Sequence, residues 1–327
     1  MKNIKLTIVF FFLISWTLKA QDTYFSQFYA FPIYLSPSLA GATEQMRVTS
    51  IYRNQWANLP NAYITYAFSI DHYIRDYKSG IGAIVVRNQE GGVYNNTSIG
   101  LSYNYTIKIN NELNIRPGIF AATHIQNIDY SSLEFADQLS RSSPTSVEVL
   151  DKEQVQHYDF AVSALAYTSK YWFGATGDHL MALNKQISYD NTYPSLKIVV
   201  YGGAKFELFK RVRSQVDRFF SLSFLYKTQA GFHQFDLGTN FEREPYRVGV
   251  WLRGSPGINE SFNINAIVLL AGVTVKDILI NYSYDITLSR LLSTTGGAHE
   301  ISLSYRFDVQ RLSNKKKKMA ALPCPTF

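Results

Sequence analysis

The stretch DILINYSYDITLS, residues 277–289, alternates apolar and polar side chains with a period of two. One side carries Ile278, Ile280, Tyr282, Tyr284, Ile286 and Leu288, and the other carries Asp277, Leu279, Asn281, Ser283, Asp285, Thr287 and Ser289. A period of two is the side-chain period of a β-strand. Soluble strands average about five or six residues, whereas a strand that crosses a bilayer at a tilt needs about nine to eleven. The length of this stretch therefore favours a membrane-crossing strand.

The same alternation recurs along most of the chain. Segments with this pattern lie at about residues 45–56, 61–75, 79–90, 93–108, 112–127, 156–169, 171–183, 193–209, 217–229, 231–243, 246–254, 261–274, 277–289 and 298–309. A soluble β-sandwich also alternates, but its strands are shorter than most of these segments. The pattern therefore predicts an all-β fold, a transmembrane outer-membrane β-barrel of about 14 antiparallel strands.

Composition argues against several other classes of protein. The chain is 46% hydrophobic and 17% charged and has one cysteine, which excludes disorder and an internal disulfide scaffold. Its mean hydropathy is −0.11, and no apolar run after residue 20 approaches the ~20 residues that a membrane helix needs. A barrel accounts for this average because polar lumen residues offset apolar lipid-facing ones.

The N-terminus has the features of an export signal. Lys2 and Lys5 precede an apolar core at residues 6–16, and Ala20 is the expected cleavage point. The chain then divides into a signal peptide at 1–20, an N-terminal aromatic segment at 21–44 that is a plug or a partner contact, a β-barrel at 45–309 and a basic periplasmic tail at 310–327. Without the signal the chain keeps 29 basic and 25 acidic residues. This near balance argues against a nucleic-acid partner.

Connection lengths and aromatic residues predict how the barrel sits in the outer membrane. Connections such as 76–79, 244–246 and 275–277 are short, whereas 129–154 is long and acidic. Outer-membrane barrels have short periplasmic turns and long external loops, so we expect both termini in the periplasm. Aromatic residues near strand ends are expected to form interfacial girdles; they are Tyr24, Phe25, Tyr73, Tyr77, Tyr130, Tyr171, Trp172, Tyr246, Trp251 and Phe307.

Two parts of the chain carry a family resemblance. The first runs from Asp22-Thr-Tyr-Phe-Ser-Gln-Phe-Tyr29 to Tyr52-Arg-Asn-Gln-Trp56, and the second is the last strand, 297–307. The order and spacing resemble the PorP/SprF family, outer-membrane proteins of the type IX secretion and gliding machinery of Bacteroidota. The family's two Asn-Pro dipeptides are replaced by Phe31-Pro32 and Ser36-Pro37. The residues that match the family motifs are Ser26, Gln27, Gly41, Tyr52, Arg53, Gln55 and Trp56.

The resemblance implies a function that involves no catalysis. It points to a non-enzymatic barrel that helps export or anchor an adhesin-like surface protein, together with periplasmic and outer-membrane secretion or gliding components. The alternative is an outer-membrane channel or transporter for a hydrophobic or small solute. The residues expected to face inward favour a hydrated or plugged lumen over an apolar channel; they are Ser98, Ser102, Asn104, Thr106, Asn281, Ser283, Asp285, Ser302, Ser304 and Arg306.

Three groups of residues are candidates for binding a partner. Phe25, Phe28, Pro32 and Pro37 lie in the N-terminal segment, where aromatic side chains are costly to leave in water. Tyr130, Leu133 and Phe135 lie in the long acidic connection. Two interpretations remain for the run Lys315, Lys316, Lys317 and Lys318. It is a docking arm that binds an acidic partner or outer-membrane lipid headgroups, or it is a solvated end of the chain.

Catalytic, cofactor and metal motifs are missing from the sequence. The six histidines, His72, His124, His157, His179, His233 and His299, include no pair at i, i+4 and no His-Glu-x-x-His. Their spacing predicts isolated polar strand residues and no metal site, and no cofactor or catalytic residue is expected. The sequence leaves four roles open for Cys324: an inert tail residue, a free thiol, an intermolecular link or a modification site.

Overall fold

The computed structural model describes residues 22–43, 45–129, 133, 135–141, 154–183, 194–209, 218–256, 262–288 and 292–307. Within these ranges, no helix combines the length and the apolar character that crossing a membrane requires. The short helices are α2 (Pro32–Leu35), η2 (Pro37–Leu39), η3 (Arg75–Tyr77), α3 (Ala136–Arg141), η5 (Leu180–Leu183) and α5 (Leu292–Thr295).

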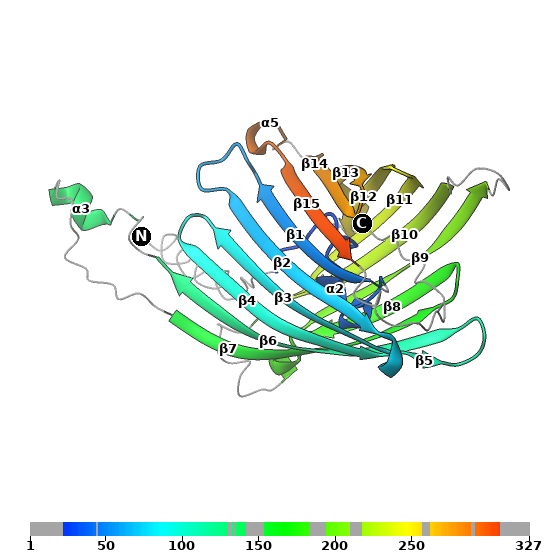
Figure 1. The fold of residues 1–327 in the computed structure, drawn as a ribbon. Coiled ribbons are helices and arrows are strands. Elements are labelled where there is room, and N and C mark those ends of the chain that lie inside the picture. Colours follow the sequence, from blue (N-terminus) through cyan, green and yellow to red (C-terminus); the bar gives the residue numbers. More distant parts are fainter. Residues whose placement is uncertain are drawn as a thin grey trace.

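The described strands form one closed antiparallel barrel (Figure 1). They are β1 (Met46–Gln55), β2 (Tyr63–Ile74), β3 (Ser79–Glu90), β4 (Tyr94–Tyr105), β5 (Ile107–Lys108), β6 (Asn114–Ile128), β7 (Gln154–Tyr167), β8 (Tyr171–Asp178), β9 (Lys197–Phe209), β10 (Arg218–Gln229), β11 (Phe232–Arg243), β12 (Tyr246–Pro256), β13 (Phe262–Val275), β14 (Ile278–Thr287) and β15 (Ala298–Phe307). Neighbouring strands in sequence pair, except that β4 and β5 both pair with β6, and β1 pairs with β15 to close the wall. Because β5 continues β4 along β6, the wall has the predicted fourteen positions.

The predicted strand ranges are confirmed to within a few residues, with one exception. Alternation predicted a strand at 171–183, but β8 ends at Asp178. The backbone of His179 is left-handed, with φ at 59°, and the four residues that follow form η5. Leu180-Met181-Ala182-Leu183 is uniformly apolar and has lost the strand period, so the strand ends where the alternation ends.

The two faces of the wall follow the predicted alternation. Ile280 is 40% exposed on the outside, and its neighbour Asn281 is 0% exposed on the inside. Asn281 Nδ2 donates a hydrogen bond of 3.0 Å to Ser302 Oγ across the β14–β15 pair. The outer face thus carries an apolar surface suited to lipid, and the inner face is polar.

The predicted aromatic girdle is correct for some residues and wrong for others. Tyr77 and Tyr246 are strongly exposed at strand ends, as a girdle requires. In contrast, Tyr73, Trp172 and Trp251 are buried and face inward. The sequence could not separate the two groups, because this lumen also contains aromatic side chains that need aromatic partners.

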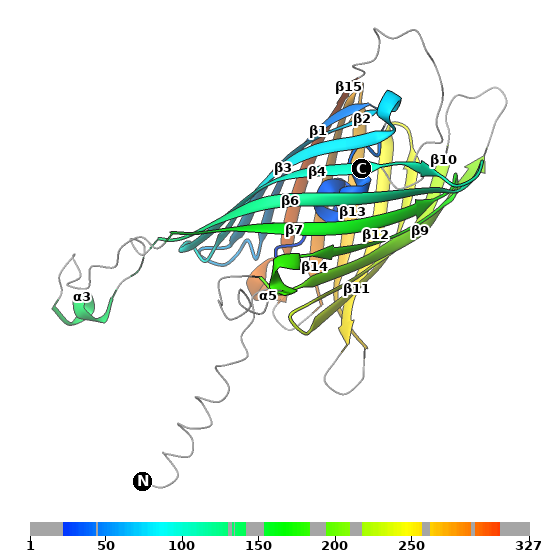
Figure 2. The same cartoon turned by 90° about the horizontal axis from the view of Figure 1, so that it is seen from below.

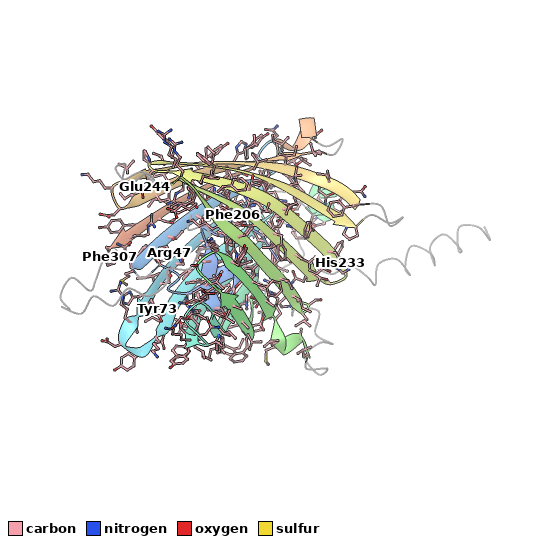
Figure 3. The ribbon with its side chains drawn as sticks, turned by 90° about the vertical axis from the view of Figure 1, so that its right-hand side faces the viewer. Arg47, Tyr73, Phe206, His233, Glu244 and Phe307 are labelled. Carbon is pink, nitrogen blue, oxygen red and sulfur yellow. The ribbon has the colours of Figure 1, made fainter. Side chains whose placement is uncertain are left out.

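The barrel has two distinct ends. At one end, η3, residues 244–245 and residues 276–277 make short connections, and we call it the turn end. The other, the loop end, carries the longer β6–β7 and β8–β9 connections. In Figure 3, Glu244 and Phe307 lie toward the turn end, and His233 lies toward the loop end.

The N-terminal segment, residues 22–43, passes through the lumen from one end to the other. Asp22 N donates a hydrogen bond to Gln229 Oε1 at the loop end (3.0 Å), and Gly41 N donates one to Asp71 Oδ2 near the turn end (2.7 Å). Figures 1 and 2 show α2 surrounded by the strands from two directions. Asp22 and Phe307 therefore lie at opposite ends of the barrel, whereas both termini of the chain, whose side of the membrane was predicted, lie outside the described residues.

Candidate functional site in the barrel lumen

Ser26 and Gln27 are fixed to the carboxylate of Glu300 on β15. The backbone N–H groups of Ser26 and Gln27 donate hydrogen bonds of 2.8 Å to its two oxygens, Oε2 and Oε1. Gln27 Nε2 also donates to the Glu300 carbonyl oxygen at 2.9 Å, and Ser302 Oγ donates to Gln27 Oε1 at 2.7 Å. All of these residues are buried, so the loop-end half of the segment is held in one position and orientation.

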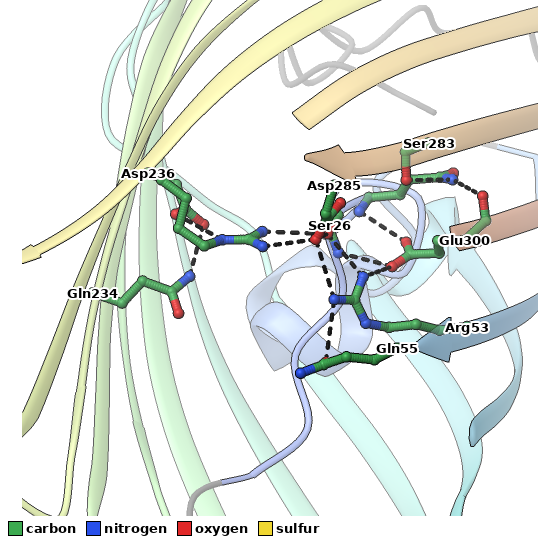
Figure 4. A network of polar contacts seen from close by, with 10 residues as sticks. Ser26, Arg53, Gln55, Gln234, Asp236, Ser283, Asp285 and Glu300 are labelled. Atoms are coloured by element: carbon green, nitrogen blue, oxygen red, sulfur yellow. Dashed lines mark hydrogen bonds and ion pairs between the residues drawn. The ribbon is translucent and has the colours of Figure 1, made fainter. Parts of the chain in front are cut away.

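Two arginines complete this network, which is drawn in Figure 4. Arg53 on β1 donates to Ser26 Oγ and to Glu300 Oε2, both at 2.9 Å, and lies 3.1 Å from Asp285 Oδ2. Arg253 on β12 donates to the same Asp285 oxygen at 2.8 Å and to Asp236 Oδ1 at 3.2 Å. Buried charges are tolerated when each is paired and hydrogen-bonded. The charged side chains that these five strands contribute are all paired with one another.

The ring of Tyr24 lies among three cations. Arg53, Arg253 and Lys227 approach its centroid to 4.9, 4.5 and 4.7 Å. Cation–π contacts of this kind are worth about 0.5–2 kcal/mol, with the larger values where water is excluded. The segment therefore offers an aromatic face to these three cations.

Aromatic packing fixes the middle of the segment. The ring of Phe28 meets Trp251 edge-on with centroids 4.8 Å apart, and Tyr29 meets Trp172 at 6.3 Å. Trp172 Nε1 donates a hydrogen bond to Tyr29 Oη at 3.3 Å. This packing explains why the two tryptophans face the lumen rather than lipid.

The turn-end half of the segment is held by small polar side chains. Asn104 Nδ2 donates to the carbonyl oxygens of Pro37 (2.8 Å) and Ala40 (2.9 Å), and the hydroxyls of Ser38 and Ser163 are 2.5 Å apart. A Cβ at Gly80 would lie 2.1 Å from the Ala40 oxygen. Glycine is therefore required at position 80 for this close approach.

A second charged group surrounds Asp22 at the loop end. Lys197 Nζ lies 2.6 Å from carboxylate oxygens of both Asp22 and Asp178, and His179 Nε2 lies 2.7 Å from Asp22 Oδ2. Burial opposes ionisation of Asp22, but His179 and Lys197 hold the pKa of its carboxyl well below its usual range. Burial also opposes protonation of His179, yet Asp22 and Asp178 raise the pKa of its imidazole to about 10. The first described residue of the segment is thus an ionised carboxylate held by cations of the wall.

Comparison with known proteins decides the family. Residues 17–305 match the family described as type IX secretion system membrane protein PorP/SprF. The chain belongs to the PorP/SprF family. No curated protein sequence matches it.

Three solved structures resemble this PorP/SprF chain in fold at low sequence identity. The toluene transporter TbuX of Ralstonia pickettii is 11% identical, with 85% of this chain and 94% of that chain covered and a TM-score of 0.48. The KdgM porin is 11% identical over 80% of this chain and 99% of that chain, with a TM-score of 0.37. A variant of the Rh. blastica porin is 8% identical over the same shares, with a TM-score of 0.34.

Several of the residues that carry the family resemblance, distant in sequence, meet in the lumen. Ser26 and Gln27 share Glu300 with Arg53, and Arg53 Nη2 donates to Gln55 Oε1 at 3.4 Å. Gly41 has a φ of 66°, which favours glycine. Tyr52 and Trp56 lie apart from the network: the ring of Tyr52 packs on Tyr66, and that of Trp56 packs on Tyr63.

The candidate partner-binding residues differ in burial, and some of them lie outside the described residues. Phe25, Phe28, Pro32 and Pro37 are buried inside the barrel, in contacts within the chain. Leu133 is exposed and Phe135 is half-buried. Tyr130, Lys315, Lys316, Lys317, Lys318 and Cys324 lie outside the described residues.

Sequence reasoning missed part of the site. Glu300, Asp285 and Arg253 carry the network, and their only signal was a charge at a lumen-facing position of a strand. The histidines predicted to be isolated are not all so: the rings of His124 and His157 stack at 4.9 Å, and His179 lies 5.9 Å from His124. Together with Asp159, His124 and His179 form one of two described groups whose donor atoms could hold a metal ion.

Proposed function

We propose that this chain is a non-enzymatic outer-membrane component of type IX secretion that helps export or anchor an adhesin-like surface protein. The observation that carries the proposal is the N-terminal segment, which spans the lumen and is fixed at both ends. A lumen that contains a segment of its own chain is unsuited to a wide open pore. We therefore place the contact with a large partner on surfaces outside the barrel lumen.

The long connection between β6 and β7 is the surface we assign to the cargo. With the turn end in the periplasm, this connection lies outside the cell. Leu133 and Leu139 expose 39% and 68% of their surface there, and apolar side chains clustered on an exposed loop favour a protein contact. Tyr130 and Phe135 belong to the same proposed contact.

We assign the periplasmic side to the secretion machinery. Short turns with basic residues at Arg75, Lys78 and Arg243 face that side in the proposed orientation. The tail residues Lys315, Lys316, Lys317 and Lys318 would add attraction to an acidic partner or to anionic lipid headgroups, at roughly 1 kcal/mol per basic residue. No nucleic-acid or cofactor role is proposed.

Deletion of residues 131–149 tests this function. External loops lie outside the hydrogen-bond ladder of the wall, so the shortened barrel should assemble and shift on gels after heating like the parent. Quantitative mass spectrometry of proteins shaved from intact cells should then show one or more surface proteins lost or released to the medium. An unchanged set of surface proteins would contradict the proposal.

One observation favours a second candidate, a binding site for an apolar solute. A pocket of about 50 Å³ lies between the segment and β9–β11. Its lining includes Phe25, Phe28, Phe31, Val199 and Leu225. If this pocket is the functional site, Leu225→Asp should reduce uptake of a small apolar solute while the surface proteins stay in place.

A further inference from the structure

We propose that His124, Asp159 and His179 bind a divalent transition metal ion of the Zn²⁺ class, and that Asp22 supports the site as the hydrogen-bond partner of His179. His124 lies on β6 and Asp159 on β7, whereas His179 follows β8. The three come from separate strands, so no local sequence motif marks them. This explains why the spacing of the histidines predicted no metal site.

The three side chains bring their donor atoms close together. The donor atoms of these three side chains all lie within 4.8 Å of one another, and His124 Nε2 is 3.9 Å from Asp159 Oδ2. His179 Nδ1 makes a short contact with the same Asp159 oxygen. Zinc binds imidazole nitrogen and carboxylate oxygen at about 2.0–2.2 Å in tetrahedral geometry, so two ligand atoms of one ion lie about 3.3–3.6 Å apart. Adjustments of about 1 Å would bring all three donors onto one ion, with a fourth position left for water.

The surroundings orient each donor in the way that metal ligands require. His179 Nε2 donates a hydrogen bond to Asp22 Oδ2, which leaves Nδ1 directed at the site. Asp159 Oδ1 accepts a hydrogen bond of 2.8 Å from Phe160 N, which leaves Oδ2 as the ligand atom. In metal sites, a ligating histidine usually donates its other ring N–H to a carboxylate, and a ligating carboxylate is itself hydrogen-bonded. His179 and Asp159 both have such partners.

The charge of the group also fits a dication. Asp22, Asp159 and Asp178 supply three carboxylates, and Lys197 supplies one ammonium. With neutral imidazoles the contacting groups therefore carry a charge of −2, which an ion of charge +2 neutralises. Buried charge of one sign is costly unless it is paired in this way.

The site links the metal to the N-terminal segment. Asp22 is the only second-layer carboxylate here that belongs to the segment rather than to the wall, among the residues described. Metal binding and docking of the segment should therefore strengthen one another. The alternative is a site without metal, in which a protonated His179 lies between the carboxylates of Asp22 and Asp159. His124 has no part in that alternative.

Zinc titration of the purified full chain in detergent tests the proposal. By calorimetry we expect one Zn²⁺ per chain, at least tenfold weaker binding in His124→Gln and Asp159→Asn, and unchanged binding in the control His233→Gln, which lies exposed on β11. Asp22→Asn should weaken binding 10–100-fold, the range for loss of a second-layer partner. Heat-modifiable migration would show that each variant is folded, and bound Co²⁺ should give visible absorption bands that His124→Gln loses.

Two results would overturn the assignment. One is the lack of saturable one-to-one binding by the folded parent. The other is equal affinity in the parent, His124→Gln and Asp159→Asn, which would place any bound zinc elsewhere. Neither result depends on the identity of a cargo, so the metal site and the proposed secretion role can fail separately.

Discussion

Arg53 on the first strand and Glu300 on the last face each other across the seam where the barrel closes, with Nη1 and Oε2 2.9 Å apart. The same carboxylate accepts the backbone N–H groups of Ser26 and Gln27. One buried ion pair therefore joins the two ends of the wall and also holds the N-terminal segment. Closure of the barrel and placement of the segment are expected to respond together when this pair is broken.

Arg53→Gln should destabilise the protein strongly. Removing Arg53 leaves the buried carboxylate of Glu300 without its ion-pair partner, whereas Asp285 keeps Arg253. Breaking a buried ion pair in this way costs about 3–5 kcal/mol. The free energy of unfolding in urea, measured by tryptophan fluorescence in detergent, checks this. Arg243→Gln, at an exposed position, is the matched control, and equal stability of the two variants would contradict the role given to the pair.

Ser38→Cys combined with Ser163→Cys should form a disulfide in membranes. The two hydroxyl oxygens are 2.5 Å apart between the segment and β7, within reach of the geometry a disulfide needs. Cys324→Ser in the background removes the native thiol. Non-reducing gels should show the cross-linked form, whereas Ser38→Cys with Ser302→Cys should stay reduced, because Ser302 contacts Gln27 instead. Failure of the first pair to cross-link would mean that the segment lies elsewhere in the membrane.

Gly80→Ala should loosen the segment at the turn end. The added Cβ would fall 2.1 Å from the Ala40 carbonyl oxygen and 2.7 Å from Asn104 Oδ1. Overpacking of this kind typically costs about 1–3 kcal/mol, and limited proteolysis should cut residues 36–43 faster. At Gly177 the nearest atom to a new Cβ is 3.7 Å away, so Gly177→Ala should behave like the parent. Similar cutting in both variants would contradict the close approach.

The lipid-facing register can be tested on one strand, β11. Leu237 is 41% exposed on the outer face near the middle of the strand, and Gln234 lines the inner pocket. Leu237→Arg should cost about 2–4 kcal/mol of folding free energy in bilayers, whereas Gln234→Arg has Asp236 beside it and should cost much less. Equal losses of folded barrel in the two variants would show that the face assignment is wrong.

The sequence predicted the wall well and the lumen poorly, for one physical reason. Alternation is local, so Ile280 and Asn281 could be assigned to opposite faces from their neighbours alone. The contacts of the lumen are not local: Ser26 and Glu300 are 274 residues apart. Single polar residues on a strand give no indication of which distant partner they meet, so the roles of Glu300 and Arg253 required the fold.

The aromatic residues show the same limit. Tyr171 and Trp172 are adjacent and must point to opposite faces, yet both suit an interfacial girdle by type. Only the placement of Tyr29 inside the barrel explains why Trp172 faces inward. The resemblance to the family included Ser26, Gln27 and Arg53 among seven motif residues, and the structure supplies the hydrogen bonds that join these three through Glu300.

Affinity purification of the tagged chain from native outer membranes in mild detergent tests the central claim most directly. The chain should bring down a large surface protein in defined stoichiometry, and deletion of residues 131–149 should abolish that association while the barrel itself stays folded. If the folded parent brings down no surface protein, and the same preparation carries small solutes across liposomes, the barrel is a transporter and the proposed secretion role is wrong.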